Sequence, residues 1–148
     1  MPSAVATFTL QGANSARSDA NDQTVQWRSG NDWALYLYSG DSSSSQYWST
    51  GEFYLQADTN RLMVSDGLYV IATSENALYT VSTVYSNQAP ISCTSPAYEG
   101  EALQCSAEGS SRSQFYVRAD TAASAGLNIY IMAAGSGSPY ASVDLVAI

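Results

Sequence analysis

The sequence predicts an all-β fold in one compact domain that spans residues 1–148, and three observations favour it. Several short runs alternate apolar and polar residues with the two-residue period of a β-strand. β-branched and aromatic residues dominate these runs, while serine, glycine, aspartate and asparagine fill the gaps between them. No segment carries an apolar stripe at helical spacing. A hydrophobic content of 45% is ample for a substantial core.

Six strands are expected from alternation alone, with turns between them. In chain order the strands are 33–38, 67–72, 77–85, 114–118, 127–132 and 141–148. Turns are expected at Asn31–Asp32, at Asp66–Gly67 and at 135–139, because glycine, proline, asparagine and aspartate favour turn geometry. The serine-rich stretch 39–45 is interpreted as a surface loop, since strand patterning continues on both sides of it.

A short phrase returns three times, at 8–12, 53–59 and 115–121: phenylalanine, a variable residue, an aliphatic residue, a polar residue and a small residue. Such recurrence indicates one building block used repeatedly. The spacing of the copies is close to even, except that the interval between the second and third also holds the cysteine pair. A closed threefold arrangement of the β-trefoil type is therefore favoured over a β-sandwich or jelly roll, which stays the alternative.

Two cysteines, Cys93 and Cys105, flank a segment that contains Pro96 and Gly100. The simplest interpretation is a local disulfide that closes a hairpin over 93–105, which implies an oxidising compartment. Two separate buried thiols in a cytosolic protein are the alternative. The start of the chain lacks the basic and apolar regions of a signal peptide, so we expect Met1 to precede a mature secreted sequence.

Charge and composition argue against several classes of function. The net charge is -8 with no histidine, and all basic residues are arginine. An acidic chain repels phosphate backbones, so neither nucleic acid nor an anionic membrane surface is an expected partner. Without histidine or lysine there is no Ser-His-Asp triad, histidine metal site, Schiff base or phosphate-binding loop. We expect no enzyme activity, no cofactor and no metal.

Aromatic residues gather between Trp27 and Trp48, and this segment is the predicted binding site. Tryptophan and tyrosine rings stack on the C–H face of a sugar, while carboxylates and amides bind its hydroxyl groups. The residues predicted to bind a ligand are Asp32, Trp33, Asp41, Tyr47 and Trp48. Burial is the competing explanation for each ring, because alternation puts Trp33 on the face of Leu35 and Leu37.

Two acidic pairs offer a catalytic alternative. Glu99 and Glu101 flank Gly100, and Asp19 lies near Asp22 in a polar loop. Two carboxylates about 5 to 9 Å apart can hydrolyse a glycosidic bond if one has a raised pKa. Solvated loop acids are the simpler explanation, and no calcium-loop motif is present to supply converging oxygens.

Two family resemblances point the same way. Gln46-Tyr47-Trp48 has the Gln-x-Trp form of ricin-type β-trefoil lectins, which implies a core tryptophan with a sugar pocket nearby, although 25–27 and 113–115 depart from that form. From Phe8 onward the chain also resembles secreted fungal modules of cell-wall and adhesin-like proteins. The segments that carry this second resemblance are the repeated phrases, 60–62, 92–93, 103–106, 114–117 and 143–146. It implies an extracellular or carbohydrate-associated role without catalytic residues.

Three hypotheses follow for the function. The leading one is a secreted, non-catalytic module that binds a glycan or a cell-wall polysaccharide through exposed aromatic rings. The second is a structural protein that self-associates through strand edges, with 127–132 as an uncharged, β-prone candidate edge. The third is a carboxylate-based glycosidase.

Overall fold

The structure is a computed structural model that describes residues 7–28, 35–38, 48–50, 52–64, 67–119, 126–133, 135 and 140–148, with the backbone alone at 27–28, 36, 38, 48–50, 119 and 126. In these ranges the fold is all-β, with antiparallel strand pairing and one short 3-10 turn in place of any α-helix. The all-β part of the prediction is therefore confirmed. No helix of the described ranges has the length and apolar character that crossing a membrane requires.

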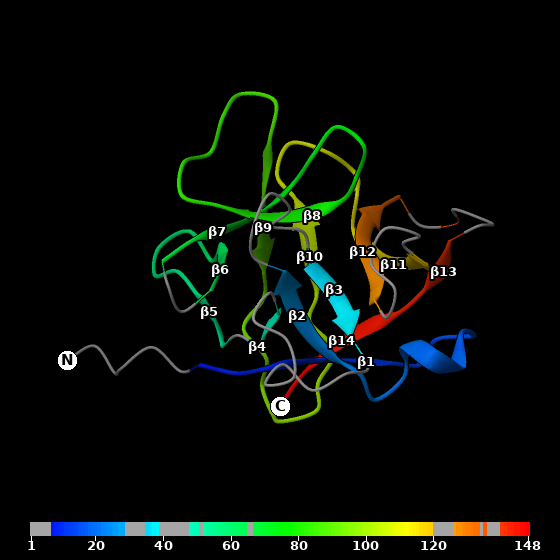
Figure 1. Cartoon of the computed structure of the whole chain (residues 1–148). Coiled ribbons are helices and arrows are strands. Elements are labelled where there is room, and N and C mark those ends of the chain that lie inside the picture. Colours follow the sequence, from blue (N-terminus) through cyan, green and yellow to red (C-terminus); the bar gives the residue numbers. More distant parts are fainter. Residues whose placement is uncertain are drawn as a thin grey trace.

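The elements are numbered in chain order, and Figure 1 labels the strands. They are β1 (Leu10–Ala13), η1 (Ser18–Ala20), β2 (Thr24–Arg28), β3 (Leu35–Tyr38), β4 (Trp48–Thr50), β5 (Phe53–Leu55), β6 (Leu62–Val64), β7 (Tyr69–Ala72), β8 (Leu78–Val81), β9 (Ala89–Cys93), β10 (Cys105–Ala107), β11 (Gln114–Ala119), β12 (Gly126–Met132), β13 (Ala141–Ser142) and β14 (Asp144–Ala147). The predicted run 77–85 is shortened, because β8 ends at Val81. The predicted run 141–148 is divided between β13 and β14.

The larger sheet has eight strands in the order β13-β11-β12-β3-β2-β1-β14, with β4 paired to β2. The two ends of the described chain meet in it, because Leu10 of β1 stands opposite Ala147 of β14. The smaller sheet has six strands in the order β10-β9-β7-β6-β5, with β8 paired to β7. Backbone hydrogen bonds between Phe8 and Phe53, at 2.9 and 2.7 Å, connect the start of β1 to β5.

One apolar core receives residues from both sheets. In the larger sheet Val25, Leu37 and Leu127 stand opposite one another on three neighbouring strands, and all three side chains are buried. The smaller sheet adds Phe53, Leu62, Val64, Val70, Ala72, Leu78 and Ile91 to the same cluster. Burying one such side chain contributes about 1.5–3 kcal/mol, so this cluster supplies the main driving force for folding.

The segment 127–132 is not a sheet edge, contrary to the expectation that motivated the self-association hypothesis. As β12, it pairs with β11 along its whole length and with β3 at Gly126–Asn128. Its other end is covered too, because the Ile131 N–H donates to the Asn76 carbonyl at 2.9 Å. An uncharged, β-branched run is also typical of a central strand that is buried on its core face, which explains the composition.

The two cysteines form the predicted disulfide. Cys93 of β9 stands opposite Cys105 of β10 in register, and their Cα atoms are 4.0 Å apart. Both residues are buried in the main cluster. The bond thus closes the 93–105 segment where it leaves the smaller sheet.

Gly12 of β1 allows the loop around η1 to pack on the larger sheet. A Cβ atom at this position would lie 2.2 Å from the Ala20 carbonyl oxygen and 2.9 Å from Leu37 Cδ1. The backbone is bonded to the same loop, since the Gly12 N–H donates to the Gln23 carbonyl and the Asp22 N–H to the Gly12 carbonyl.

We expect Gly12→Ala to lower the free energy of unfolding by about 2–3 kcal/mol, the upper part of the range for overpacking, because the added methyl group meets a backbone carbonyl oxygen of the loop. Gly109→Ala is the matched control. Gly109 has a φ of +77° and open space around its Cβ position, so that variant meets only backbone strain, about 1 kcal/mol. Chemical denaturation measures both. Equal losses in the two variants would contradict the steric explanation.

Replacing both cysteines with alanine should lower the free energy of unfolding by about 3 kcal/mol, because the disulfide closes a loop between residues 12 positions apart. Urea denaturation of the wild type with and without reductant, beside the double variant, measures the effect. The reduced wild type and the variant should agree. A wild type whose stability does not respond to reductant would contradict the prediction.

Candidate functional site

The predicted ligand residues lie outside the part of the chain on which the structure gives side chains. Four of them lie outside the described ranges altogether: Asp32, Trp33, Asp41 and Tyr47. Trp48 is described by its backbone, which stands opposite Arg28 in the β2–β4 pair. The tryptophan-rich site therefore stays a prediction. Two other places in the described ranges bring aromatic rings and polar groups around a hollow.

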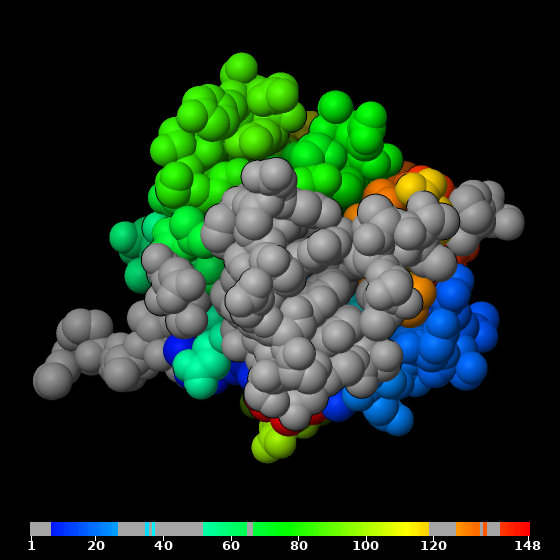
Figure 2. Space-filling view, in the orientation of Figure 1, coloured from blue at the N-terminus to red at the C-terminus, as the bar shows by residue number. Residues whose placement is uncertain are grey.

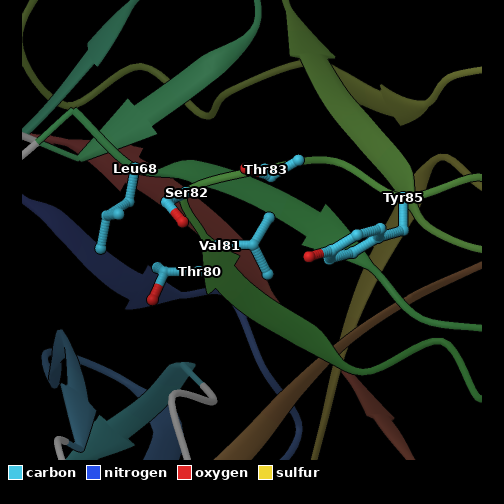
Figure 3. Close-up of a pocket in the computed structure, with 6 residues that line it drawn as sticks. All are labelled: Leu68, Thr80, Val81, Ser82, Thr83 and Tyr85. Atoms are coloured by element: carbon cyan, nitrogen blue, oxygen red, sulfur yellow. The ribbon is translucent and has the colours of Figure 1, made fainter.

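The first place, the β8 hollow, lies along β8 and the chain that follows it. Its lining combines two aliphatic side chains, three hydroxyl side chains and one tyrosine: Leu68, Thr80, Val81, Ser82, Thr83 and Tyr85. Its volume is about 400 Å³, within the range of small-ligand sites. In Figure 3 the ring of Tyr85 extends from the chain after β8, with its hydroxyl end directed toward Val81.

Tyr85 is an exposed ring on a braced turn. The residue is 63% exposed, unusual for a large aromatic side chain. Its N–H donates to Gln88 Oε1 at 3.0 Å, and the Gln88 N–H donates to the Tyr85 carbonyl at 3.0 Å. These reciprocal bonds fix the backbone that carries the ring, so less conformational entropy is lost when a ligand stacks on it. The same region protrudes at the top of the molecule in Figure 2.

The second place is a tyrosine–arginine cluster of Tyr116, Tyr130, Tyr140 and Arg118. Tyr116 and Arg118 alternate on β11 and so share a face, on which Tyr116 stands opposite Tyr130 of β12. The Tyr130 and Tyr140 rings meet edge to face with centroids 5.0 Å apart. The Arg118 guanidinium carbon lies 5.3 Å from each of these two ring centroids, a cation–π distance.

A second hollow, the β13 hollow, adjoins this cluster and has a volume of about 510 Å³. Its lining residues are Ala16, Gln114, Tyr116, Gly135, Tyr140, Ala141 and Ser142. Gln114 Nε2 donates to the carbonyls of Phe115 and Val143 at 3.2 and 3.3 Å, which fixes the amide. Tyr140 belongs to both the cluster and the hollow, so the two form one continuous surface.

Two of the four acids considered for catalysis or metal binding, Asp19 and Glu101, contact groups close to them in the chain. Asp19 is ion-paired with Arg17 at 2.8 Å, and a Glu101 carboxylate oxygen accepts the Ala97 N–H. Asp22 occupies a turn with a φ of +65°, and Glu99 is exposed. Among the described residues no cluster of three or more acidic or cysteine side chains is arranged to hold a metal ion.

The strongest electrostatic interaction of the smaller sheet joins Arg61 to Glu108. Arg61 Nε and Nη2 donate to the two carboxylate oxygens at 2.9 and 3.0 Å, and the Ser92 hydroxyl donates to the same carboxylate. The hydrogen bond from Arg61 is the main reason why the pKa of Glu108 lies below its usual value; partial burial opposes it, and Ser92 adds to it. The same hydrogen bond raises the pKa of Arg61. This pair braces β6 against β9 and β10.

No family model matches the sequence, and no curated protein or solved structure is significantly similar to the chain. The resemblances to ricin-type lectins and to fungal cell-wall modules therefore stay expectations from the sequence. The function has to be argued from the geometry of the hollows.

The sequence prediction does not include Tyr85 or Arg118. Tyr85 stands at the end of a run expected to be a strand, whereas β8 ends at Val81. The Ser86-Asn87 pair that follows Tyr85 is the turn signal that could have identified it. For Arg118 the signal is its alternation with Tyr116, but the contribution of Tyr140 comes from a segment far along the chain.

We expect Glu108→Gln to lower the free energy of unfolding at neutral pH by about 0.5–1 kcal/mol, a value typical of an ion pair that is about one third exposed. Because the folded-state pKa of Glu108 is lowered, its contribution is present above the unfolded pKa and is lost as the pH falls through the folded pKa. The stabilities of variant and wild type should therefore converge in acid. Denaturation at a series of pH values tests this, with the exposed Glu99→Gln as the charge-matched control. A constant difference at every pH would contradict it.

Proposed function

We propose that the protein is a secreted, non-catalytic β module that binds a glycan or a cell-wall polysaccharide, and that the β8 hollow is its binding site. The observation that carries this proposal is the exposed ring of Tyr85 on a braced turn beside Ser82 and Thr83. A pyranose ring offers a C–H face and several hydroxyl groups. The phenol ring can stack on the C–H face, and the side-chain hydroxyls can form hydrogen bonds with the hydroxyl groups of the sugar.

The proposal is of binding and not of hydrolysis. A glycosidase needs two carboxylates that face one bond, with one pKa raised by burial. The pKa of Glu108 is lowered by its hydrogen bond from Arg61, the opposite of what a general acid needs. Asp19 and Glu101, from the acidic pairs, are engaged in local contacts, which favours structural roles for them.

Secretion fits the disulfide. A bond between Cys93 and Cys105 persists in an oxidising compartment such as the cell exterior, where a glycan or a cell-wall polysaccharide is the available partner. Self-association through strand edges stays the alternative function. It no longer rests on β12, which is paired on both sides.

Within the all-β class, the strand pairing favours the sandwich alternative over the trefoil. In a threefold arrangement the three copies of the repeated phrase would pair equivalently. Instead β1 pairs with β2 and β14, and β11 pairs with β12 and β13, both within the larger sheet, while β5 pairs with β6 in the smaller one. We therefore propose two sheets facing a common core.

Tyr85→Ala should weaken binding to the retained glycan by about five- to thirtyfold, since loss of a stacking ring removes about 1–2 kcal/mol. The ligand is found first by a pull-down with a panel of insoluble polysaccharides, and the affinity for a soluble oligomer of it is then measured by calorimetry. Tyr98→Ala is the matched control, because Tyr98 is a similarly exposed tyrosine, 68%, near the C-terminal strand.

Three outcomes would contradict the proposal or move the site. If the wild type binds none of the polysaccharides in the panel, the proposed function is wrong. Equal losses in Tyr85→Ala and Tyr98→Ala would show a non-specific aromatic effect. A loss confined to Trp33→Ala or Trp48→Ala, with Tyr85→Ala unchanged, would place the site in the predicted tryptophan segment.

A further inference from the structure

Arg118 differs from the other arginines whose side chains the structure describes. Arg17 is paired with Asp19 and Arg61 with Glu108. Arg112 donates to the Thr73 carbonyl, Asn76 Oδ1 and the Ser110 hydroxyl, so its guanidinium serves a turn. Arg118 is exposed and forms no ion pair with any described residue. Among the described residues, its positive charge is thus not neutralised by a carboxylate, on a chain whose net charge is -8.

The guanidinium of Arg118 is nevertheless held in place. It lies 5.3 Å from the centroids of both Tyr130 and Tyr140, and Nη1 donates to the Tyr140 hydroxyl at 3.4 Å. Tyr130 is 6% exposed, so this part of the support is fixed by burial. An arginine stacked on aromatic rings keeps most of its N–H donors at the edge of the guanidinium plane. Since these donors are pre-oriented, a bidentate acceptor binds them at a reduced entropic cost.

The groups beside Arg118 suit a sugar better than a simple anion. The adjoining β13 hollow is lined by Gln114, Tyr140 and Ser142. The Gln114 amide nitrogen is used by two backbone carbonyls, while its Oε1 accepts no hydrogen bond from the described residues and is suited to a ligand hydroxyl. The Ser142 side chain is exposed at the same surface. Amide and hydroxyl groups of this kind recognise the hydroxyls of a pyranose ring.

We propose that Arg118, with Tyr140 and the β13 hollow, forms a second binding site that takes a carboxylate-bearing sugar such as a uronic acid. The guanidinium binds the carboxylate in the bidentate manner, and Ser142 receives ring hydroxyls. Gln114 lies four residues from Arg118 on β11, about 13 Å away, so it meets the next sugar of the oligomer. This site is separate from the β8 hollow and does not depend on it. The two differ in chemistry, because the described lining of the β8 hollow carries no charged side chain.

The net charge of the protein limits the size of the ligand. A long polyanion would meet the repulsion of the whole acidic surface, whereas a short uronate places one carboxylate in direct contact with Arg118. At physiological ionic strength charges are screened over about 8 Å, so distant acids oppose such a contact only weakly. The expected ligand is therefore a short or sparsely charged acidic glycan.

The test compares a galacturonate trisaccharide with its methyl ester, which keeps the sugar rings and removes the charges. Calorimetry on the wild type should show at least tenfold tighter binding of the acid, as expected for a charge-assisted bidentate contact. Arg118→Gln should bind acid and ester equally, and Arg118→Lys should retain only part of the preference because it lacks the planar fork. Arg61→Gln is the charge-matched control and should keep the preference in full.

Other results would overturn the inference. Equal binding of acid and ester by the wild type, or an unchanged preference in Arg118→Gln, would remove Arg118 as the carboxylate site. If a glutamate-rich peptide binds as tightly as the trisaccharide, the site recognises a carboxylate and not a sugar. Tyr85→Ala should leave the acid preference unchanged. A glycan-binding defect in Tyr85→Ala alone would support the β8 hollow and contradict the Arg118 site. An acid-binding defect in Arg118→Gln alone would support the Arg118 site and contradict the β8 hollow.

Discussion

The arrangement of this protein depends on burying the aliphatic faces of two antiparallel sheets in one core. Strands of the larger sheet offer alternate residues to that core. The pairing of Val25, Leu37 and Leu127 shows that the registers of β2, β3 and β12 agree on which face is buried. A slip of one residue in any of these strands would turn its apolar side chains to solvent. The register that protects the core thus also determines which residues face outward. Tyr116 and Arg118 share a surface because Phe115 and Val117 occupy the core.

Besides the core, a polar junction at the turn of the β7–β8 hairpin connects that hairpin to the larger sheet. Asn76 has a φ of +74°, a conformation that asparagine tolerates better than most residues. Its carbonyl accepts the Ile131 N–H of β12, while its side-chain oxygen and the Thr73 carbonyl accept hydrogen bonds from Arg112. One turn therefore binds both the central strand of the larger sheet and the chain that leads into β11. Because β8 begins directly after this turn, the junction also sets the position of the β8 hollow.

The sequence predicts the class of the fold well and its details only in part. Long alternating runs such as 114–118 and 127–132 form strands, because their apolar residues alone can fill a core face. Short strands such as β6 and β10 have only three residues each, too few for a period to be visible, and they are held by neighbours such as the Cys93–Cys105 pair. The edge expected at 127–132 is wrong because composition cannot distinguish an exposed edge from a strand that partners cover. The candidate sites are harder still. Tyr130 and Tyr140 come together through the pairing of β13 with β11, which no local pattern encodes.

The two proposed sites differ in how a chain without histidine or lysine would select a ligand. A protein that lacks these residues has few ways to bind a charged ligand, and here two of the arginines with described side chains are neutralised by carboxylates. Arg112 is used by the Asn76 turn, as its three neutral acceptors show. Arg118 has rings instead of a carboxylate as its support, and rings stabilise a cation without cancelling its charge. A carboxylate partner in the protein would have given the same order to the side chain but would have competed with any acidic ligand. The aromatic support is therefore what separates an arginine available for recognition from one used for stability.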